Sequence, residues 1–268
     1  MADVPPEIIG HYTSEVDEGE RLARGVHRLE LVRVQDVMRR HLPSRTLQIL
    51  DVGGGTGVHA EWLAADGHSV HVVDPVPRHV EAVQSLDGVT SELGDARRLS
   101  ATDDSVDVVL LFGPQYHLTE ADDRAQALAE AARVVRPGGL VFVAAVSRFA
   151  SLFDGLARGF LFEPDFPAIV ERDLREGQHR NTSGLPHRFT TAYFHHPEEL
   201  RAEISGAGLD VVDLVGLEGL SGWLPELADR WEDPEARELI LYSARVVESE
   251  PSLLGLSAHL LAVARRRA

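Results

Sequence analysis

The glycine-rich segment ILDVGGGTGVHAEWLA at residues 49–64 most constrains what this chain can fold into. The apolar run TLQILDV (46–52) predicts a buried strand, and residues 58–65 predict a short helix that ends at Asp66-Gly67. Glycines between a strand and a helix permit a tight turn and let a ligand approach the backbone. The first N–H groups of the helix add a partial positive charge. The segment therefore predicts a ligand site at a strand–helix turn.

The alternation of strand and helix continues beyond this turn. We expect further strands at residues 69–74, 89–93, 106–112, 140–146, 209–219 and 257–267. We expect further helices at residues 17–42, 77–86, 121–135, 197–205 and 234–248, and a turn at 136–139. Such an alternation predicts an α/β fold in which helices cover both faces of a parallel sheet.

Composition excludes several classes of site and partner. The sequence has no Cys, and all 26 of its basic residues are Arg, so thiolate metal sites and lysine Schiff bases are excluded. A net charge of −17 disfavours a nucleic-acid partner. No apolar run reaches the roughly 18 residues of a membrane span, and no secretory signal is visible. We therefore expect a cytoplasmic protein with neither nucleic-acid nor membrane partners.

Three carboxylates lie at the predicted carboxyl ends of successive strands. Asp74 follows the second strand and could accept the hydroxyls of a ribose, while Asp95 could accept the amino hydrogens of an adenine. Asp51 precedes the glycines, where it would repel a pyrophosphate and attract a cation. With no basic residue among the three, this set favours an adenosine that carries a positive charge. A nicotinamide dinucleotide is the alternative, but its G-x-G-x-x-G/A spacing fails at Val58.

Five segments together resemble the successive motifs of class I S-adenosylmethionine-dependent methyltransferases. They are ILDVGGGTG (49–57), VDP (73–75), GDA (94–96), DVVLLFGPQYHL (107–118) and VRPGG (135–139). The resemblance covers residues 46–146. It implies a Rossmann-like, doubly wound sheet of seven strands with the last strand antiparallel, and S-adenosyl-L-methionine as cofactor. It also implies cofactor contacts at Asp51, Gly53, Gly55, Asp74, Pro75, Asp95, Ala96, Phe112 and Gly113.

The resemblance also suggests how the rest of the chain is organised. Residues 1–45 resemble an N-terminal helical lid that closes over the methionine end of the cofactor, with Tyr12 facing the sulfonium. A surface helix start is the alternative for Tyr12. Residues 46–146 form the cofactor-binding core and residues 197–268 complete its sheet. Residues 147–196 lack a clear alternation and are too long for an ordinary loop, so we expect a cap or lid inserted after the fifth strand.

Methyl transfer from a sulfonium is an in-line displacement that needs a base only where the nucleophile is protonated. His117, beside Tyr116, is the candidate base; alternatively both residues pack around the cofactor. Tyr193, His195 and Trp223 are candidate substrate contacts, or else part of the core of the cap. Glu218 could meet a substrate amine, or else be a solvated side chain. No metal is expected, because the fourth and fifth strands end without the acids that metal-dependent relatives carry.

We therefore expect an S-adenosylmethionine-dependent methyltransferase. Its acceptor would be a nitrogen, oxygen or carbon nucleophile on a small organic molecule of the secondary-metabolite type, attacked in an in-line SN2 transfer. An NAD(P)-dependent oxidoreductase on a similar fold, or a protein that binds the cofactor without turnover, are the alternatives. The oligomeric state is left open.

Overall fold

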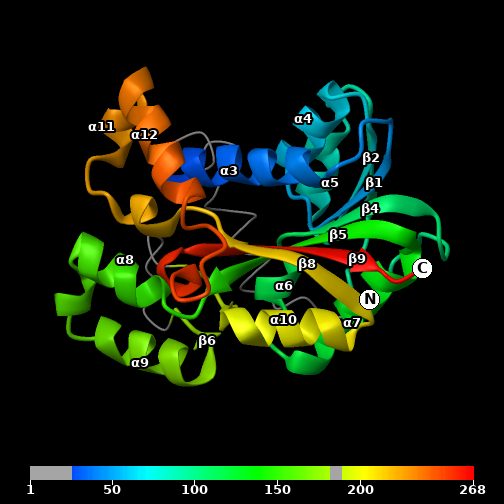
Figure 1. The fold of residues 1–268 in the computed structure, drawn as a ribbon. Helices are drawn as coiled ribbons and strands as arrows, with labels where there is room; N and C mark the ends of the chain where they lie inside the picture. The colour runs from blue at the N-terminus through cyan, green and yellow to red at the C-terminus, as the bar shows by residue number, and fades with distance from the viewer. Residues whose placement is uncertain (1–25, 182–188) are drawn as a thin grey trace.

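The computed structural model describes residues 26–181 and 189–268 and centres on one sheet with helices on both faces (Figure 1). The sheet has nine strands. They are β1 (Gln48–Val52), β2 (Ser69–Asp74), β3 (Val89–Leu93), β4 (Val106–Leu111), β5 (Val135–Ser147), β6 (Gln178–His179), β7 (Ala192–His195), β8 (Leu209–Gly216) and β9 (His259–Arg266). Tyr12 and most of the expected N-terminal lid lie outside the described residues.

The strand order follows the doubly wound pattern. Strands β3, β2, β1, β4 and β5 are neighbours in that order and all run parallel. On the other edge of β5 lies β9, which runs antiparallel to it, and β8 pairs with β9. The carboxyl ends of β1 to β5 and the amino end of β9 therefore meet at one edge of the sheet. This confirms the Rossmann-like α/β architecture and the antiparallel last strand.

Helices cover the two faces separately. One apolar cluster packs α3 (Val26–His41), α4 (Val58–Ala65) and α5 (Pro77–Val83) on one face of the sheet. A second cluster packs α7 (Ala121–Val134) and α10 (Pro197–Gly206) on the other face. The shorter α6 (Pro114–His117) follows β4 directly, and α11 (Leu227–Trp231) and α12 (Pro234–Arg245) lie between β8 and β9. None of the helices described here is both long and apolar enough to cross a membrane.

The segment expected as a cap contributes to the sheet as well. It forms α8 (Ala150–Arg158) and α9 (Phe166–Glu176), which pack against each other, and the short strands β6 and β7. β7 pairs in parallel with the end of β5, opposite Val146 and Ser147, and β6 pairs with β7. The described sheet therefore has two strands more than the seven expected, namely β6 and β7. They can pair because β5 extends beyond the end of β4 and leaves its edge open at Val146 and Ser147.

The turn expected at residues 136–139 is a bulge within β5. Val106 pairs with Val135, yet Val108 pairs with Leu140, so four residues of β5 lie opposite Asp107 alone. Arg136 Nη1 donates to Asp107 Oδ1 at 2.9 Å, and Gly138 has a φ of 78°. Strand β5 therefore begins before the turn residues rather than after them.

Candidate active site

A pocket opens at the edge of the sheet where the parallel strands end. Every cofactor contact expected within the described residues lines it: Asp51, Gly53, Gly55, Asp74, Pro75, Asp95, Ala96, Phe112 and Gly113. Tyr116 and His117 line it too. The pocket continues past β4 to Ala144 and Val146 of β5, and ends at Glu30, Leu217 and His259. Its first part thus lies over β1 to β4, and its far part lies over β5 and β9.

The glycine turn is shaped by close packing on one side and open space on the other. Gly53 has a φ of 70°, and its N–H donates to Val73 O at 2.7 Å. A Cβ on Gly53 would lie 2.6 Å from Cδ of Pro114, so α6 can approach only a glycine there. Gly55 also has a positive φ, 58°, but a Cβ on it would meet nothing within 4 Å. Gly55 thus offers bare backbone to a ligand in the pocket.

Asp74 organises this turn from the end of β2. Its Oδ2 accepts from the Gly55 N–H and its Oδ1 from the Val76 N–H, both at 2.9 Å, while His79 Nδ1 lies 3.0 Å from Oδ1. Because a carboxylate oxygen has two acceptor positions, Oδ2 keeps one for a ligand hydroxyl. Asp74 therefore has a structural role in the loop in addition to the expected contact with a ribose.

Asp51 is buried without any hydrogen-bond partner among the described residues. Its side chain is 1% exposed, and neither carboxylate oxygen is hydrogen-bonded. Burial, followed by repulsion from Asp74, raises the pKa of Asp51 from 3.8 to about 7. An unsatisfied buried carboxylate is costly, and a cation or N–H donor would relieve that cost. The first part of the pocket is therefore suited to a positively charged ligand.

Asp95 has a basic partner, Arg97, that was not identified from the sequence. Arg97 donates to both oxygens of Asp95, from Nη2 at 2.8 Å and from Nε at 3.0 Å. Burial would raise the pKa of Asp95, but these hydrogen bonds outweigh burial and hold the pKa below its usual value. Asp95 therefore stays ionised as an acceptor facing the pocket.

Tyr116 and His117 form an aromatic wall with a residue that the sequence did not point to. Their ring centroids are 4.7 Å apart, and the His117 ring stacks on Phe189 at 6.0 Å and 23°. Phe189 belongs to the insertion between β6 and β7, so two distant segments close this side of the pocket. The geometry fits a packing role and places His117 where an acceptor could reach it.

The four expected substrate contacts do not line this pocket. Arg124 lies over the Tyr193 ring at 3.7 Å, and His195 is buried against Glu203 at 3.2 Å. Trp223 Nε1 donates to Leu256 O at 2.5 Å. Glu218 is 0% exposed, although it contacts His259, which does line the pocket. Tyr193, His195 and Trp223 contact protein partners outside the lining, whereas Glu218 reaches the pocket through His259. Contact of these four side chains with a substrate stays a prediction.

Comparison with known proteins identifies the family. A sequence profile described as a methyltransferase domain matches residues 49–139. A ubiquinone biosynthesis O-methyltransferase of Azorhizobium caulinodans is 30% identical over 197 residues, which cover 69% of this chain and 70% of the relative. The chain belongs to the class I S-adenosylmethionine-dependent methyltransferases. The family's cofactor is S-adenosylmethionine, and the buried Asp51 carboxylate fits that cation.

Further relatives of this methyltransferase chain agree with that assignment. An uncharacterized methyltransferase of Mycobacterium tuberculosis is 34% identical over 158 residues, and the match spans 59% of each protein. This chain therefore spans about three fifths of that relative. A crystal structure of an S-adenosylmethionine-dependent methyltransferase from Mesorhizobium loti has a TM-score of 0.60 at 19% identity, covering 89% of this chain and 100% of that one. This similarity extends the shared fold beyond the matched domain.

Proposed function

We propose that this chain binds S-adenosylmethionine across the ends of β1 to β4 and transfers its methyl group to a small organic acceptor in the far part of the pocket. The observation that carries this proposal is the buried carboxylate of Asp51, which has no hydrogen-bond partner in the described part of the chain, in the same pocket lining as the open backbone of Gly55. The cofactor supplies a methyl group that its sulfonium already activates. The protein would then hold donor and acceptor in line and exclude water.

The roles of the residues follow from their positions. Asp74 Oδ2 would accept a ribose hydroxyl, Asp95 an adenine amino hydrogen, and Asp51 would balance the positive methionine end. Tyr116, His117 and Phe189 would form the wall beside the reacting methyl group. The relatives named for ubiquinone biosynthesis include both O- and C-methyltransferases. The proposed acceptor is a small organic nucleophile, and the proposed reaction is an in-line SN2 methyl transfer.

Calorimetry with S-adenosylmethionine tests the cofactor site. We expect the wild-type protein to bind it, and Asp74→Ala to weaken binding about 10- to 100-fold, because a charge-assisted hydrogen bond and the turn that Asp74 holds are both lost. Asp87→Ala, an exposed aspartate in the turn before β3, is the matched control and should bind as the wild type does. No binding at millimolar concentration, or an unaffected Asp74→Ala variant, would contradict the proposal.

A thermal-shift comparison separates the proposed cofactor from the alternative dinucleotide. S-adenosylmethionine should raise the melting temperature, because a ligand that binds only the native state stabilises it. NAD and NADP at the same concentrations should leave it unchanged, since Val58 breaks their spacing and Asp51 would oppose a pyrophosphate. A larger shift with either dinucleotide would favour the oxidoreductase alternative.

A further inference from the structure

The far end of the pocket is built by segments that the cofactor motifs do not include. Because β9 is antiparallel, its first residue, His259, lies at the same sheet edge as the ends of β1 to β5. Leu217 from the end of β8 and Glu30 from α3 line the pocket beside His259. With the cofactor over β1 to β4, this end is left for the acceptor.

His259 is held by a fully buried carboxylate. Its Nδ1 lies 2.5 Å from Glu218 Oε1, and Glu218 is 0% exposed. Glu218 Oε2 accepts from Ser257 Oγ at 2.6 Å and from the His259 N–H at 3.1 Å. This hydrogen bond assigns the Nδ1–H tautomer, so Nε2 is the nitrogen that carries the lone pair. Glu218 therefore acts on the pocket through His259 rather than by direct contact.

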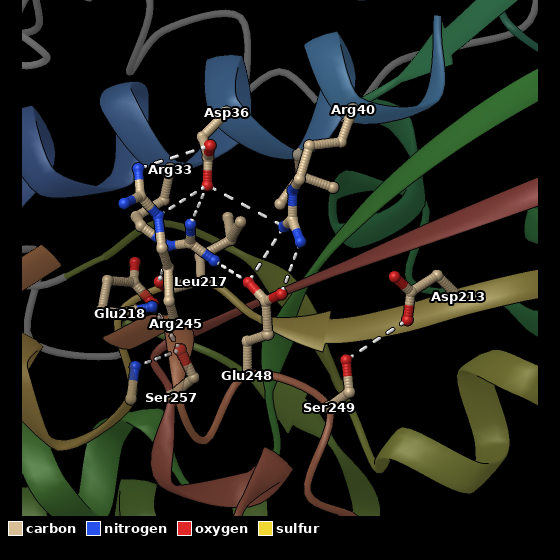
Figure 2. A network of polar contacts seen from close by, with 12 residues as sticks. Arg33, Asp36, Arg40, Asp213, Leu217, Glu218, Arg245, Glu248, Ser249 and Ser257 are labelled. Carbon is tan, nitrogen blue, oxygen red and sulfur yellow. Dashed lines mark hydrogen bonds and ion pairs between the residues drawn. The ribbon is translucent and has the colours of Figure 1, made fainter. Parts of the chain in front are cut away.

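Glu218 lies at one side of a network of polar contacts that includes Ser257, Leu217 and Arg33 (Figure 2). Ser257 Oγ accepts the N–H groups of Glu218 and Gly219 at 2.9 and 3.1 Å, and Arg33 Nε donates to Leu217 O at 3.1 Å. The guanidinium of Arg33 makes its ion pairs with Asp36 and Glu248 (Figure 2). Arg33 thus hydrogen-bonds to the backbone beside Glu218, while Asp36 and Glu248 balance the positive charge of Arg33.

Glu30 adds a second carboxylate on the pocket side. Its Oε2 lies 3.8 Å from His259 Nδ1 and 3.3 Å from Nδ1 of His27, its neighbour one turn earlier on α3. Two carboxylates around one imidazole favour a positive charge there and oppose a developing phenolate. A protonated amine is the acceptor class that this electrostatic environment suits.

The same three side chains also have the composition of a metal site. His259 Nδ1 is hydrogen-bonded to Glu218 Oε1, and Glu218 Oε2 accepts from Ser257 Oγ and from the His259 N–H. These ligand atoms therefore already have hydrogen-bond partners within the protein. The arrangement therefore favours proton transfer over metal binding.

We propose that Glu30, Glu218 and His259 form an amine site in which the acceptor binds as an ammonium and His259 takes its proton. This inference rests on the proposed methyl transfer. The ammonium N–H bond breaks, the proton passes to His259 Nε2, and the nitrogen keeps the electron pair. That pair forms the bond to the methyl carbon as the S–C bond breaks and its pair stays on sulfur. Glu218 is the positioning residue that stabilises the imidazolium.

A pair of matched probes tests the ammonium preference without turnover. Benzylamine and benzyl alcohol have nearly the same shape but differ in charge at neutral pH. In calorimetry on the protein saturated with S-adenosylhomocysteine at pH 7.5, we expect benzylamine to bind about tenfold or more tighter than benzyl alcohol, from charge-assisted hydrogen bonding. Equal affinities, or a preference for the alcohol, would overturn the proposal.

Variants locate the source of that preference. Glu30→Gln and Glu218→Gln should each reduce the preference for benzylamine several-fold while S-adenosylmethionine binds as in the wild type. His71→Gln, a partly exposed histidine on β2 outside the pocket lining, is the control and should keep the full preference. A preference retained in both glutamate variants would overturn the proposal. Failure of the wild type to bind S-adenosylmethionine would instead refute the proposed function.

The pH profile of methylation distinguishes the proton acceptor from a purely structural histidine. With benzylamine as acceptor, kcat should fall about 100-fold or more in His259→Gln, and its rise with pH through the histidine range should disappear. Among residues 26–181 and 189–268, the charged groups facing His259 are Glu218, Glu30 and, through Glu30, His27. A profile unchanged in shape would contradict the role of His259. Activity that requires added zinc or magnesium and is abolished by a chelator would show a metal site in its place.

Discussion

Burial raises the pKa of the Asp51 carboxyl to about 7, so a charged ligand in the pocket would change its ionisation state. Because its folded-state pKa is raised, the protonated form is favoured and the free protein loses stability as pH rises from about 4 to about 7. A cation bound beside Asp51 would lower the pKa of Asp51 again, because it favours the ionised carboxylate. Binding of the cofactor and loss of the Asp51 proton should therefore be coupled.

That coupling can be measured as proton release. At pH 6, below the raised pKa, Asp51 is mostly protonated, so binding of S-adenosylmethionine should release close to one proton and should weaken relative to pH 8. Calorimetry in two buffers with different ionisation enthalpies gives the number of protons. Asp51→Asn keeps the shape but cannot ionise, and should release none at pH 6. The same proton count in both proteins would argue against Asp51 as the counterion.

At the scale of elements, the turn after β1 and the helix α6 are fitted to each other. Gly53→Ala places a methyl group against Pro114 and forces a positive φ on alanine, so we expect a loss of about 2–4 kcal/mol of unfolding free energy in urea titrations. Gly138→Ala, in the bulge of β5, has the positive φ without the contact and should cost about 1 kcal/mol. Equal losses in the two variants would show that backbone strain alone sets the cost.

Gly55 should behave differently from both. Its Cβ position is open and faces the pocket, so Gly55→Ala should cost no more stability than Gly138→Ala. It should nevertheless weaken S-adenosylmethionine about tenfold or more in calorimetry, because the methyl group occupies space that the ligand needs. Unchanged affinity would place the ligand away from this backbone.

At the scale of the whole molecule, a buried ion cluster joins the insertion to the core. Glu203 on α10 accepts from Arg124 of α7 at 2.7 Å, from Gln115 of α6 at 2.8 Å, and faces His195 of β7 at 3.2 Å. Burial alone would raise the pKa of Glu203, but the hydrogen bonds from His195 and Arg124 outweigh it and lower the pKa from 4.5 to about 2. The stability that ionised Glu203 contributes is present above pH 4.5 and is lost as pH falls through 2.

Glu203→Gln tests this junction. At pH 7 the variant should lose about 3 kcal/mol of unfolding free energy, because the charge of Arg124, only 2% exposed, is left without its partner. The difference should narrow below pH 4.5, because the unfolded wild-type chain takes up a proton at Glu203 there, whereas the folded protein does so only near pH 2. Glu232→Gln, whose ion pair with Arg28 is exposed, should cost less than about 1 kcal/mol at either pH. A difference independent of pH would show that packing, rather than charge, holds the junction.

The core sheet was predictable because its signals are local. The run at 89–93 predicts β3 with its observed bounds, and the three carboxylates near the ends of β1, β2 and β3 all line the first part of the pocket. Parallel strands end at a common edge, so residues that follow separate strands come together without any knowledge of long-range contacts.

What depended on long-range pairing was not predictable. β7 has four residues and exists because β5 extends past β4, and the bulge in β5 is defined only by its register against Asp107. His259 looks like any residue before an apolar run, because only the antiparallel pairing of β9 carries it to the pocket. Arg97 lies two residues after Asp95 in the sequence, and that proximity is the signal that could have revealed their pairing.

The reversed direction of β9 separates two tasks along the chain. The residues proposed to bind the adenosine all precede residue 119. The residues proposed to bind the acceptor lie mainly where β8 ends and β9 starts. The connection between these strands, residues 217–258, begins with Leu217 in the pocket lining and with Glu218 against His259. Substitutions in this connection would therefore change which acceptor is bound without altering the residues proposed to bind the cofactor.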